Sequence, residues 1–416
     1  MSATAKPTPR FAGGQPGEAP SPALAPPPGN PRFPLFDGLR GIAVLGILAF
    51  HVFETTARLG FGVPGKTAEV LGTQAVIVFF CISGFLLYRP YVAARASGRR
   101  GPRTARYARR RAFRILPAYW TVLTILGLFP GIVGVMTGDW WRYYGYLQLY
   151  SGRTLNRGIP VAWTLGVEVT FYVLLPVWAA LIRRIRRGGL LVSELGPLLA
   201  IAAAGAVVQV AAVRGHIGHL VGVSLAGQIT WIAIGMGLAV VSVAAQRDAG
   251  LRRWAVRIGD RAGACWLLSL AALAGLVALV PPGGLFGLIA AVQTPQPLGR
   301  SVAKIGLEAV MAAALVFPAV FGGETRRCLP RRVLALAPVV WLGVISYSFY
   351  LWHYTVIQFI ALKHDPGFFS ASGLGLLDHL HVARTGLLYL VSLLATGLLA
   401  SASYQFVELP FLRRKG

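Results

Sequence analysis

The chain has 416 residues, of which 55% are apolar and only 13% are charged, about half the charged share of an ordinary globular protein. With a mean hydropathy of +0.62, this composition excludes a soluble globular domain and indicates a polytopic membrane protein. The net charge of +26 would suggest nucleic-acid binding in a soluble protein, but no zinc-ligand spacing, RNA-binding signature or basic amphipathic helix accompanies the cations. We therefore expect no nucleic acid, no metal site and no resident cofactor.

Residues 1–34 are rich in Pro, Ala and Gly and show no periodic pattern of apolar residues. Such a segment cannot bury enough apolar surface to offset the entropy that is lost on folding. We therefore predict a disordered cytoplasmic tail over 1–34, followed by one transmembrane domain over 35–416.

Ten apolar stretches follow, each about 20 residues long and able to cross a hydrocarbon core of roughly 30 Å. They lie near 37–57, 70–90, 114–135, 161–182, 194–213, 224–245, 263–282, 304–322, 339–361 and 384–405. About 29 of the 40 Lys and Arg fall in the tail and in alternate connections, against about 10 in the others. The positive-inside rule then predicts an all-α, multi-pass protein of the inner (plasma) membrane with both termini cytoplasmic. The third span is the least regular, because Pro117 and Pro130 interrupt it.

Two ionisable residues of the first span are functional candidates, Arg40 near its start and His51 within it. Eleven residues of helix bring both side chains to one face, roughly 16 Å apart along the axis. This separation is comparable to the length of an extended pantetheine arm. An ionisable residue at membrane depth is a functional candidate, since a guanidinium can bind phosphate and an imidazole can exchange a proton near neutral pH.

Ten arginines lie between Arg89 and Arg114, in the first connection predicted to face the cytoplasm. Such a cluster determines topology and contacts anionic lipid. Its last two members, Arg111 and Arg114, are three residues apart and share a helix face. They could also clamp a polyphosphate at the mouth of the third span, and both interpretations stay open from the residues alone.

Two further ionisable residues are placed near the depth of His51. Glu168 lies five residues past Trp163 on the fourth span, and His353 lies on the ninth. An imidazole oriented by a carboxylate is a general-base arrangement, so Glu168 is predicted to orient His51. A buried histidine is often a hydrogen-bonded structural group, and for His353 this interpretation is slightly favoured.

Simpler interpretations suit four other polar or small residues. Glu54 and Glu308 lie near outer span ends, where solvation accounts for them. Ser83 and Gly84 are small residues suited to close helix packing, and no Gly-x-Ser-x-Gly elbow surrounds Ser83 to make it a nucleophile.

Six short motifs together point to one family. They are, in chain order, Arg40 with His51 after ten intervening residues, Phe79-Phe80 with Ser83-Gly84-Phe85, Arg111-x-x-Arg114 with Ile115 and Pro117, Trp163-Thr164-Leu165 with Glu168 and Phe171-Tyr172, Ile345-Ser346-Tyr347-Ser348 with Tyr350-Leu351-Trp352-His353, and Tyr404 with Glu408-Leu409-Pro410. With these motifs in this order, from about Phe36 to Arg414, the chain resembles the integral-membrane acyltransferase 3 family. That family comprises ten-helix O-acetylases that modify surface polysaccharides, glycolipids and some antibiotics.

The resemblance implies a membrane O-acyltransferase with acyl-CoA as co-substrate. It implies that Arg40, Arg111 and Arg114 engage the acyl-CoA from the cytoplasmic side. His51 would then act where the thioester meets the acceptor hydroxyl. Together with the general-base arrangement expected from their similar depth, this makes His51 the predicted general base and Glu168 its predicted catalytic partner.

Other motif residues are candidate substrate-binding groups, namely Ser83, Trp352 and His353. The implied acceptor is a cell-envelope glycan, a glycolipid or a glycosylated metabolite that is reached from outside the membrane. The alternative is a multi-pass transporter or lipid-handling permease, for which ten spans and buried charges would also serve. The two functions can be distinguished by experiment, because only an acyltransferase would consume a thioester in a reaction that requires His51.

Overall fold

The computed structural model of the protein describes residues 33–56, 58–185, 189–281, 297–322, 328–362 and 382–414. Over these ranges the regular secondary structure is helical, with no strand. The predicted tail over 1–34 lies outside the described residues except for Phe33 and Pro34. The first helix begins at Pro34, and proline is favourable at the first helical position because no backbone hydrogen bond is required of it there.

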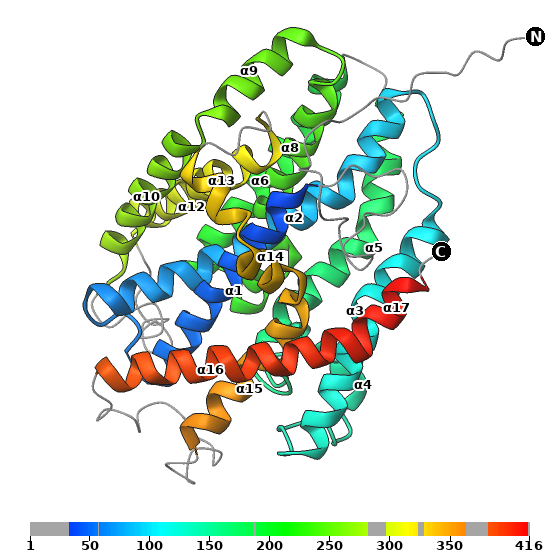
Figure 1. Ribbon diagram of the computed structural model, residues 1–416. Helices are drawn as coiled ribbons and strands as arrows, with labels where there is room; N and C mark the ends of the chain where they lie inside the picture. The colour runs from blue at the N-terminus through cyan, green and yellow to red at the C-terminus, as the bar shows by residue number, and fades with distance from the viewer. Residues whose placement is uncertain are drawn as a thin grey trace, which may run out of the picture.

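The described residues form nineteen helical segments of very different length, most of them α-helices. They are, in chain order, α1 (Pro34–Thr55), α2 (Gly62–Ala96), α3 (Thr104–Leu128), α4 (Trp140–Tyr144), η2 (Gln148–Tyr150), η3 (Pro160–Ala162), α5 (Trp163–Arg184), α6 (Leu190–Val213), α7 (His219–Val223), α8 (Leu225–Ala244), α9 (Ala249–Asp260), α10 (Ala262–Leu279), α12 (Leu298–Val320), α13 (Leu329–Leu334), α14 (Ala337–Val344), α15 (Ser346–Leu362), α16 (Val382–Ser403), η5 (Tyr404–Glu408) and α17 (Leu409–Arg413). Figure 1 shows them packed into one helical bundle.

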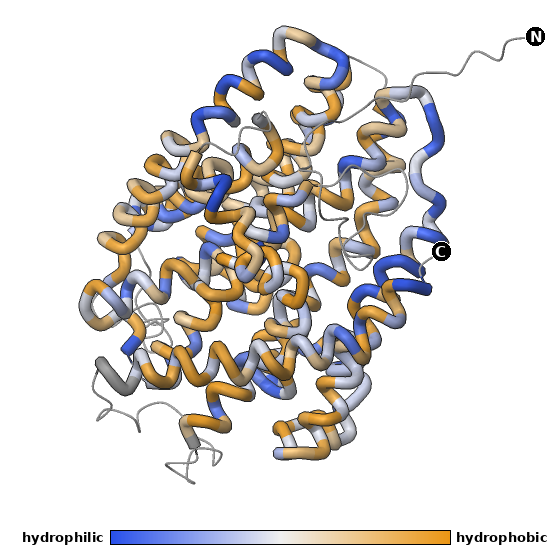
Figure 2. Tube along the Cα trace, viewed as in Figure 1, coloured by the Kyte–Doolittle hydropathy of each residue, from blue (hydrophilic) through white to orange (hydrophobic). Residues whose placement is uncertain are grey.

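Among the described residues, eight helical segments are long and apolar enough to cross a membrane, judged by length and composition. They correspond to all of the predicted spans except the third and the ninth. Figure 2 shows that apolar residues cover these helices over much of their length. Within a bilayer the backbone must satisfy its own hydrogen bonds, and a helix does so within one segment.

The third and ninth spans differ from the prediction. α3 runs without a break through Pro117, so the interruption expected there is wrong. The ninth span is divided at Ile345 into α14, of eight residues, and α15, of 17 residues. The structure confirms an all-α polytopic membrane protein, whereas the number of ten spans and the cytoplasmic placement of the termini remain predictions.

α2 lies at the centre of the bundle, in contact with α1, α5, α8, α10 and α12 (Figure 1). It has 35 residues, so it is about 52 Å long and extends well beyond the hydrocarbon core. Its approach to α8 requires glycine on both helices. A Cβ on Gly84 would lie 2.2 Å from the carbonyl oxygen of Ile232, and one on Gly235 would lie 1.9 Å from that of Cys81. The close helix packing expected at Gly84 is therefore confirmed.

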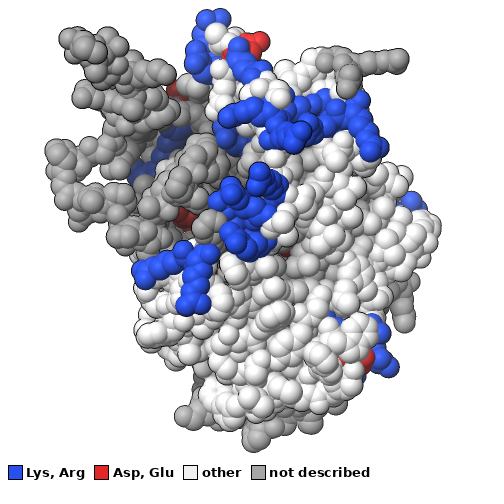
Figure 3. All heavy atoms as spheres, turned by 90° about the vertical axis from the view of Figure 1, so that its right-hand side faces the viewer, with Lys and Arg blue, Asp and Glu red and all other residues white. Residues whose placement is uncertain are grey.

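The first basic connection is shorter than predicted. α2 continues to Ala96 and α3 begins at Thr104, so most of the segment between Arg89 and Arg114 is helical. Arginine is a good helix former, so a helix that leaves the membrane can continue into an arginine-rich segment. Figure 3 shows Lys and Arg gathered over one part of the surface, beside a broad uncharged area. We call the end of the bundle that carries residues 97–103 and α9 the arginine-rich end.

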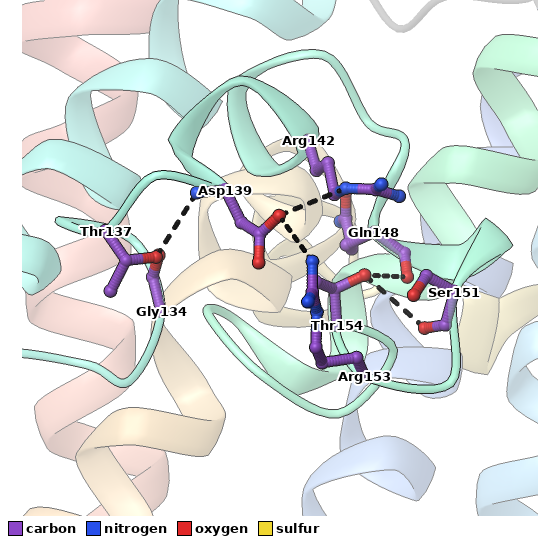
Figure 4. Close-up of polar contacts among 8 residues, drawn as sticks. All are labelled: Gly134, Thr137, Asp139, Arg142, Gln148, Ser151, Arg153 and Thr154. Carbon is purple, nitrogen blue, oxygen red and sulfur yellow. Dashed lines mark hydrogen bonds and ion pairs between the residues drawn. The ribbon is translucent and has the colours of Figure 1, made fainter.

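The segment between α3 and α5 covers the opposite end of the bundle with short helices and turns. Asp139 holds it together, because its Oδ1 lies 3.0 Å from Nη2 of Arg153 and 3.3 Å from Nε of Arg142 (Figure 4). The Thr154 hydroxyl donates to the carbonyl oxygen of Gln148 at 2.9 Å. These contacts fix the connection that leads into α5.

The predicted topology can be tested with reporter fusions. Because basic connections are retained in the cytoplasm, a cytoplasmic reporter should be active when fused after Arg187 or at Gly416, and inactive near Arg153. Alkaline phosphatase, which is active only outside the cytoplasm, should give the reverse pattern at the same three positions. An outer location for Gly416 would contradict the arrangement of ten spans.

Candidate functional site

Two cavities follow one another along α1, α2 and α5. We call the first, of about 120 Å³, the arginine cavity; its polar lining comprises Arg40, Ser83, Arg111, Arg114, Thr164, Glu168, Tyr172, Ser346, Tyr347 and Tyr350. We call the second, of about 470 Å³, the histidine cavity; its polar lining includes His51, Glu54, Glu69, Asn156, Gln228, Lys304 and Glu308. On α2 the histidine cavity is lined between residues 69 and 77 and the arginine cavity between 76 and 87. The arginine cavity therefore lies nearer the arginine-rich end.

Three residues line both cavities and separate them. They are Val76 on α2, Thr164 on α5 and Tyr350 on α15. The hydroxyls of Thr164 and Tyr350 lie 2.7 Å apart, and that of Tyr350 donates to the carbonyl oxygen of Val161 at 2.6 Å. We call this layer the partition, and a ligand that occupies both cavities must pass it.

The three arginines predicted to bind the donor all line the arginine cavity. Arg40 comes from α1, whereas Arg111 and Arg114 come from successive turns of α3. Arg40 pairs with Asp37, one turn earlier, at 3.3 Å. The Nε of Arg111 is buried and has no hydrogen-bond partner among the described residues. The cavity thus offers a cluster of positive charge with at least one N–H donor available to an anionic ligand.

A carboxylate near the end of the described chain holds Arg114 in place. Nη1 of Arg114 lies 3.5 Å from Oε2 of Glu408. Glu408 is 2% exposed and accepts a hydrogen bond of 2.5 Å from the hydroxyl of Ser348. It closes the π-helical segment η5, a local irregularity that is frequent at functional sites. Glu408 is therefore a positioning residue for Arg114.

Glu168 lies in the arginine cavity and not beside His51. Its Oε1 accepts a hydrogen bond from the Ser83 hydroxyl at 2.6 Å, and its Oε2 accepts one from Tyr172 at 2.8 Å. The predicted pairing of Glu168 with His51 is therefore wrong. The reason is depth along α5, because Thr164 of the partition precedes Glu168 by one helical turn.

The carboxylate that meets His51 is Glu54, one turn further along α1. Nδ1 of His51 and Oε2 of Glu54 lie 2.6 Å apart. Because a carboxylate accepts hydrogen bonds, this pairing assigns the hydrogen of the neutral imidazole to Nδ1 and leaves Nε2 free to accept a proton. The position of Glu54 near a span end suggests that its carboxylate is solvated. Glu54 follows His51 by three residues, however, so the two side chains share a face of α1 and can meet. Glu54 therefore orients the imidazole.

His353 lies beside His51, with 5.1 Å between the ring centroids. It is fully buried, and its Nδ1 donates to the carbonyl oxygen of Tyr350 at 2.8 Å. Its Nε2 has no hydrogen-bond partner among the described residues. Trp352, the next residue on α15, packs against the apolar cluster that includes Tyr119. Neither His353 nor Trp352 is among the residues that line the two cavities.

The histidine cavity carries polar groups of the kinds that bind sugar hydroxyls. Glu308 is 2% exposed and forms an ion pair of 2.7 Å with Lys304, so the expectation that Glu308 is solvated is wrong. Asn156 and Gln228 add amides, and Trp163 adds an aromatic ring. Within the described ranges, no three His, Cys, Asp or Glu side chains are grouped so that they could hold a metal ion.

Sequence reasoning thus missed the roles of four residues, Glu54, Glu308, Tyr350 and Glu408. Glu54 and Glu308 carried a usable signal, because His51 and Glu54 are three residues apart and Lys304 and Glu308 are four apart. No local signal indicates the role of Tyr350, since the partition exists only where three helices meet.

Comparisons with known proteins identify the family of the chain. A family model described as "Acyltransferase domain" matches residues 34–404. The peptidoglycan O-acetyltransferase OatA of Listeria monocytogenes is 22% identical over 409 residues, which cover 92% of this chain and 56% of that protein. The O-acetyltransferase OatA of Staphylococcus aureus is 23% identical over 427 residues, which cover 93% of this chain and 58% of that protein. Nodulation protein 10 of Rhizobium leguminosarum is 29% identical over 186 residues, which cover 39% and 48% of the two chains.

No solved structure matches the chain significantly. The chain spans little more than half the length of the two O-acetyltransferases. The family match nevertheless extends over nearly all of the described residues and includes both cavities. It confirms the resemblance carried by the six motifs, and this chain belongs to the acyltransferase family.

Proposed function

We propose that this protein is a membrane O-acyltransferase of the inner (plasma) membrane. It moves an acyl group such as acetyl from cytoplasmic acyl-CoA to a hydroxyl of a cell-envelope glycan, a glycolipid or a glycosylated metabolite. The observation that carries the proposal is the succession of a cationic cavity, a thin partition and a cavity with an oriented histidine, in a chain of the acyltransferase family. The name of the Listeria monocytogenes relative, a peptidoglycan O-acetyltransferase, supports a glycan acceptor.

The arginine cavity binds the phosphates of the donor, acyl-CoA. Guanidinium groups bind phosphate through paired N–H donors, and the buried Nε of Arg111 lacks such a partner in the protein. Arg40 and His51 are on the continuous helix α1, roughly 16 Å apart along its axis. A donor held by its phosphates among the arginines can therefore extend its thioester across the partition to the imidazole.

The chemical step follows from the orientation of His51. As the acceptor oxygen attacks the thioester carbonyl carbon, a C–O bond forms and the hydroxyl proton passes to Nε2 of His51. The C–S bond breaks, and the CoA sulfur leaves and takes up a proton from the imidazolium. Glu54 stabilises the imidazolium that forms between these two proton transfers, as the orienting carboxylate does in hydrolase triads.

The function is tested with purified protein in proteoliposomes, labelled acetyl-CoA and envelope glycan. We expect labelled ester on the glycan and an equal amount of free CoA. A transporter or permease, the alternative function, would leave the thioester intact. Substrate uptake without thioester cleavage would therefore overturn the proposal.

Glu54→Gln should lower the transfer rate by roughly 10–100-fold, because the amide keeps the shape but loses the charge that orients a histidine. Glu54→Asp should recover part of the rate. Glu168→Gln is the informative comparison, because Glu168 contacts Ser83 and Tyr172 in the other cavity. It should change the affinity for acetyl-CoA more than the rate at saturating donor. The reverse pattern in these two variants would contradict the assignment of Glu54.

A further inference from the structure

A third cavity, of about 100 Å³, lies beside the histidine cavity among α2, α6, α10 and α12. We call it the lateral groove. Its walls are mostly aliphatic and include Val70 from α2, Val210 from α6 and Leu276 from α10. The groove reaches the surface of the bundle, because Val213 at its rim is 44% exposed. α10, which forms one wall of the groove, is apolar along its length (Figure 2).

The lateral groove and the histidine cavity share part of their lining. Thr73, Gln209, Lys304 and Glu308, from three helices, line both. On α2, residues 69, 72, 73 and 76 face the histidine cavity, whereas residues 70, 73 and 74 face the groove. These two sets are neighbouring stripes of one helix. A single ligand can therefore occupy the groove and the cavity together.

Two features of the groove do not suit a purely apolar ligand. Arg300 and Lys304 line it, and Lys304 is 33% exposed beside its partner Glu308. Gln74 is 2% exposed, yet neither its amide nitrogen nor its amide oxygen has a hydrogen-bond partner among the described residues. Buried polar groups are nearly always hydrogen-bonded, so Gln74 indicates a polar group of a ligand at this point.

We propose that the lateral groove holds the hydrocarbon chain of a lipid-linked acceptor. Its phosphate lies by Arg300 and Lys304, within reach of Gln74, and its sugar projects into the histidine cavity towards His51. This inference rests on the proposed function and specifies the class of acceptor. The aliphatic walls of the groove suit the hydrocarbon, Arg300 and Lys304 suit the phosphate, and the histidine cavity, which Lys304 also lines, suits the sugar. A free phosphate would not use the aliphatic walls, and a neutral lipid would not use the cations.

The first experiment measures binding in the absence of any acyl donor. The protein in nanodiscs is labelled with a photoreactive polyprenyl phosphate, and unlabelled polyprenyl phosphate, polyprenol or inorganic phosphate is added as competitor. We expect polyprenyl phosphate to compete at least about 10-fold better than either of the others, since hydrogen bonds to charged groups are the strong ones. Equal competition by polyprenol would indicate a general lipid groove, and equal competition by inorganic phosphate would indicate a soluble-anion site. Either result overturns the proposal.

The second experiment repeats the labelling with variants of the groove. Val210→Trp fills the groove, and Val207→Trp is the matched control, because Val207 is 67% exposed on the same helix and does not line the groove. We expect labelling to fall about 10-fold in Val210→Trp and to stay unchanged in Val207→Trp, with similar thermal unfolding of both. Equal labelling of the two variants contradicts the proposal.

Gln74→Leu separates binding from folding. It keeps the size of the side chain and removes an amide that has no partner in the protein. We expect labelling by polyprenyl phosphate to fall about 10-fold while the Tm is unchanged or higher, because an unpaired buried polar group is lost. Full labelling with a lowered Tm would show that Gln74 is purely structural and would contradict its role in the groove.

Transfer is then measured with one sugar in two forms, linked to a lipid phosphate and free in water. Loss of transfer to the lipid-linked form alone in Val210→Trp supports the groove. Equal transfer to both forms by the wild type and by Val210→Trp overturns the groove and retains the proposed function. Binding of polyprenyl phosphate without any transfer by the wild type retains the groove and overturns the proposed function.

Discussion

His51→Ala should lower the rate of acyl transfer by about 10²–10⁴-fold, because a positioned general base contributes an acceleration of that size. The imidazole lines the larger cavity, and its Nδ1 is held at 2.6 Å by Glu54. Removing the ring removes the base that the proposed mechanism requires. The arginine cavity, on the other side of the partition, is unchanged. The affinity for acetyl-CoA should therefore stay close to that of the wild type.

The measurement is label transfer from acetyl-CoA in membranes, with donor binding and thermal unfolding followed for each variant. His219→Ala is a suitable control, because His219 is exposed at the start of α7 and lines neither cavity. It should retain wild-type activity. Wild-type turnover by folded His51→Ala would exclude His51 as the base, although the chain would still belong to the acyltransferase family.

Arg111→Gln should weaken acetyl-CoA binding by roughly 10–100-fold. A hydrogen bond to a charged group contributes about 1.5–3 kcal/mol, and each 1.4 kcal/mol changes a dissociation constant about tenfold. Arg111 is the cleanest arginine to test, because its buried Nε has no partner among the described residues. Arg111→Lys should bind with intermediate affinity, since an ammonium group provides a point charge in place of a planar fork.

Calorimetric titration of acetyl-CoA into purified protein measures this effect directly. Arg106→Gln is the matched control, because Arg106 is exposed on the same helix and does not line the cavity. Arg114→Gln is less informative, since it also removes the ion pair between Arg114 and Glu408, which is 2% exposed. Unchanged donor affinity in Arg111→Gln would remove Arg111 from the donor site.

The positions of most spans and the face shared by Arg40 and His51 could be read directly from the chain. Both depend on local rules. A membrane-crossing segment must be apolar, about 20 residues long and helical, and helical rise and periodicity then place any two residues of that segment relative to one another. The same rules place Arg111 and Arg114 on one face of α3, and the structure shows both at the arginine cavity.

Pairs of residues close in sequence could be recognised from the sequence, but their meaning was ambiguous. Glu54 follows His51 by three residues, yet so short a spacing is equally compatible with a solvated carboxylate at a helix end. The ambiguity is resolved by burial, because the side chains of His51 and Glu54 are only 14% and 22% exposed. Exposure depends on what the neighbouring helices cover, and no local pattern of residues states it.

The amino-acid sequence by itself determined an all-helical membrane protein, its family, and the chemical types that meet in its site, because apolar length, charge and motif order are properties of the chain alone. Only the tertiary structure decided which carboxylate contacts which partner, Glu54 meeting His51 and Glu168 meeting Ser83 and Tyr172. Glu168 is separated from His51 by the partition, since α5 enters the bundle with Thr164 at the level where Tyr350 and Val76 meet it. A shift of one helical turn, about 5.4 Å, decides between the two cavities, and that depth is set by packing between helices distant in sequence.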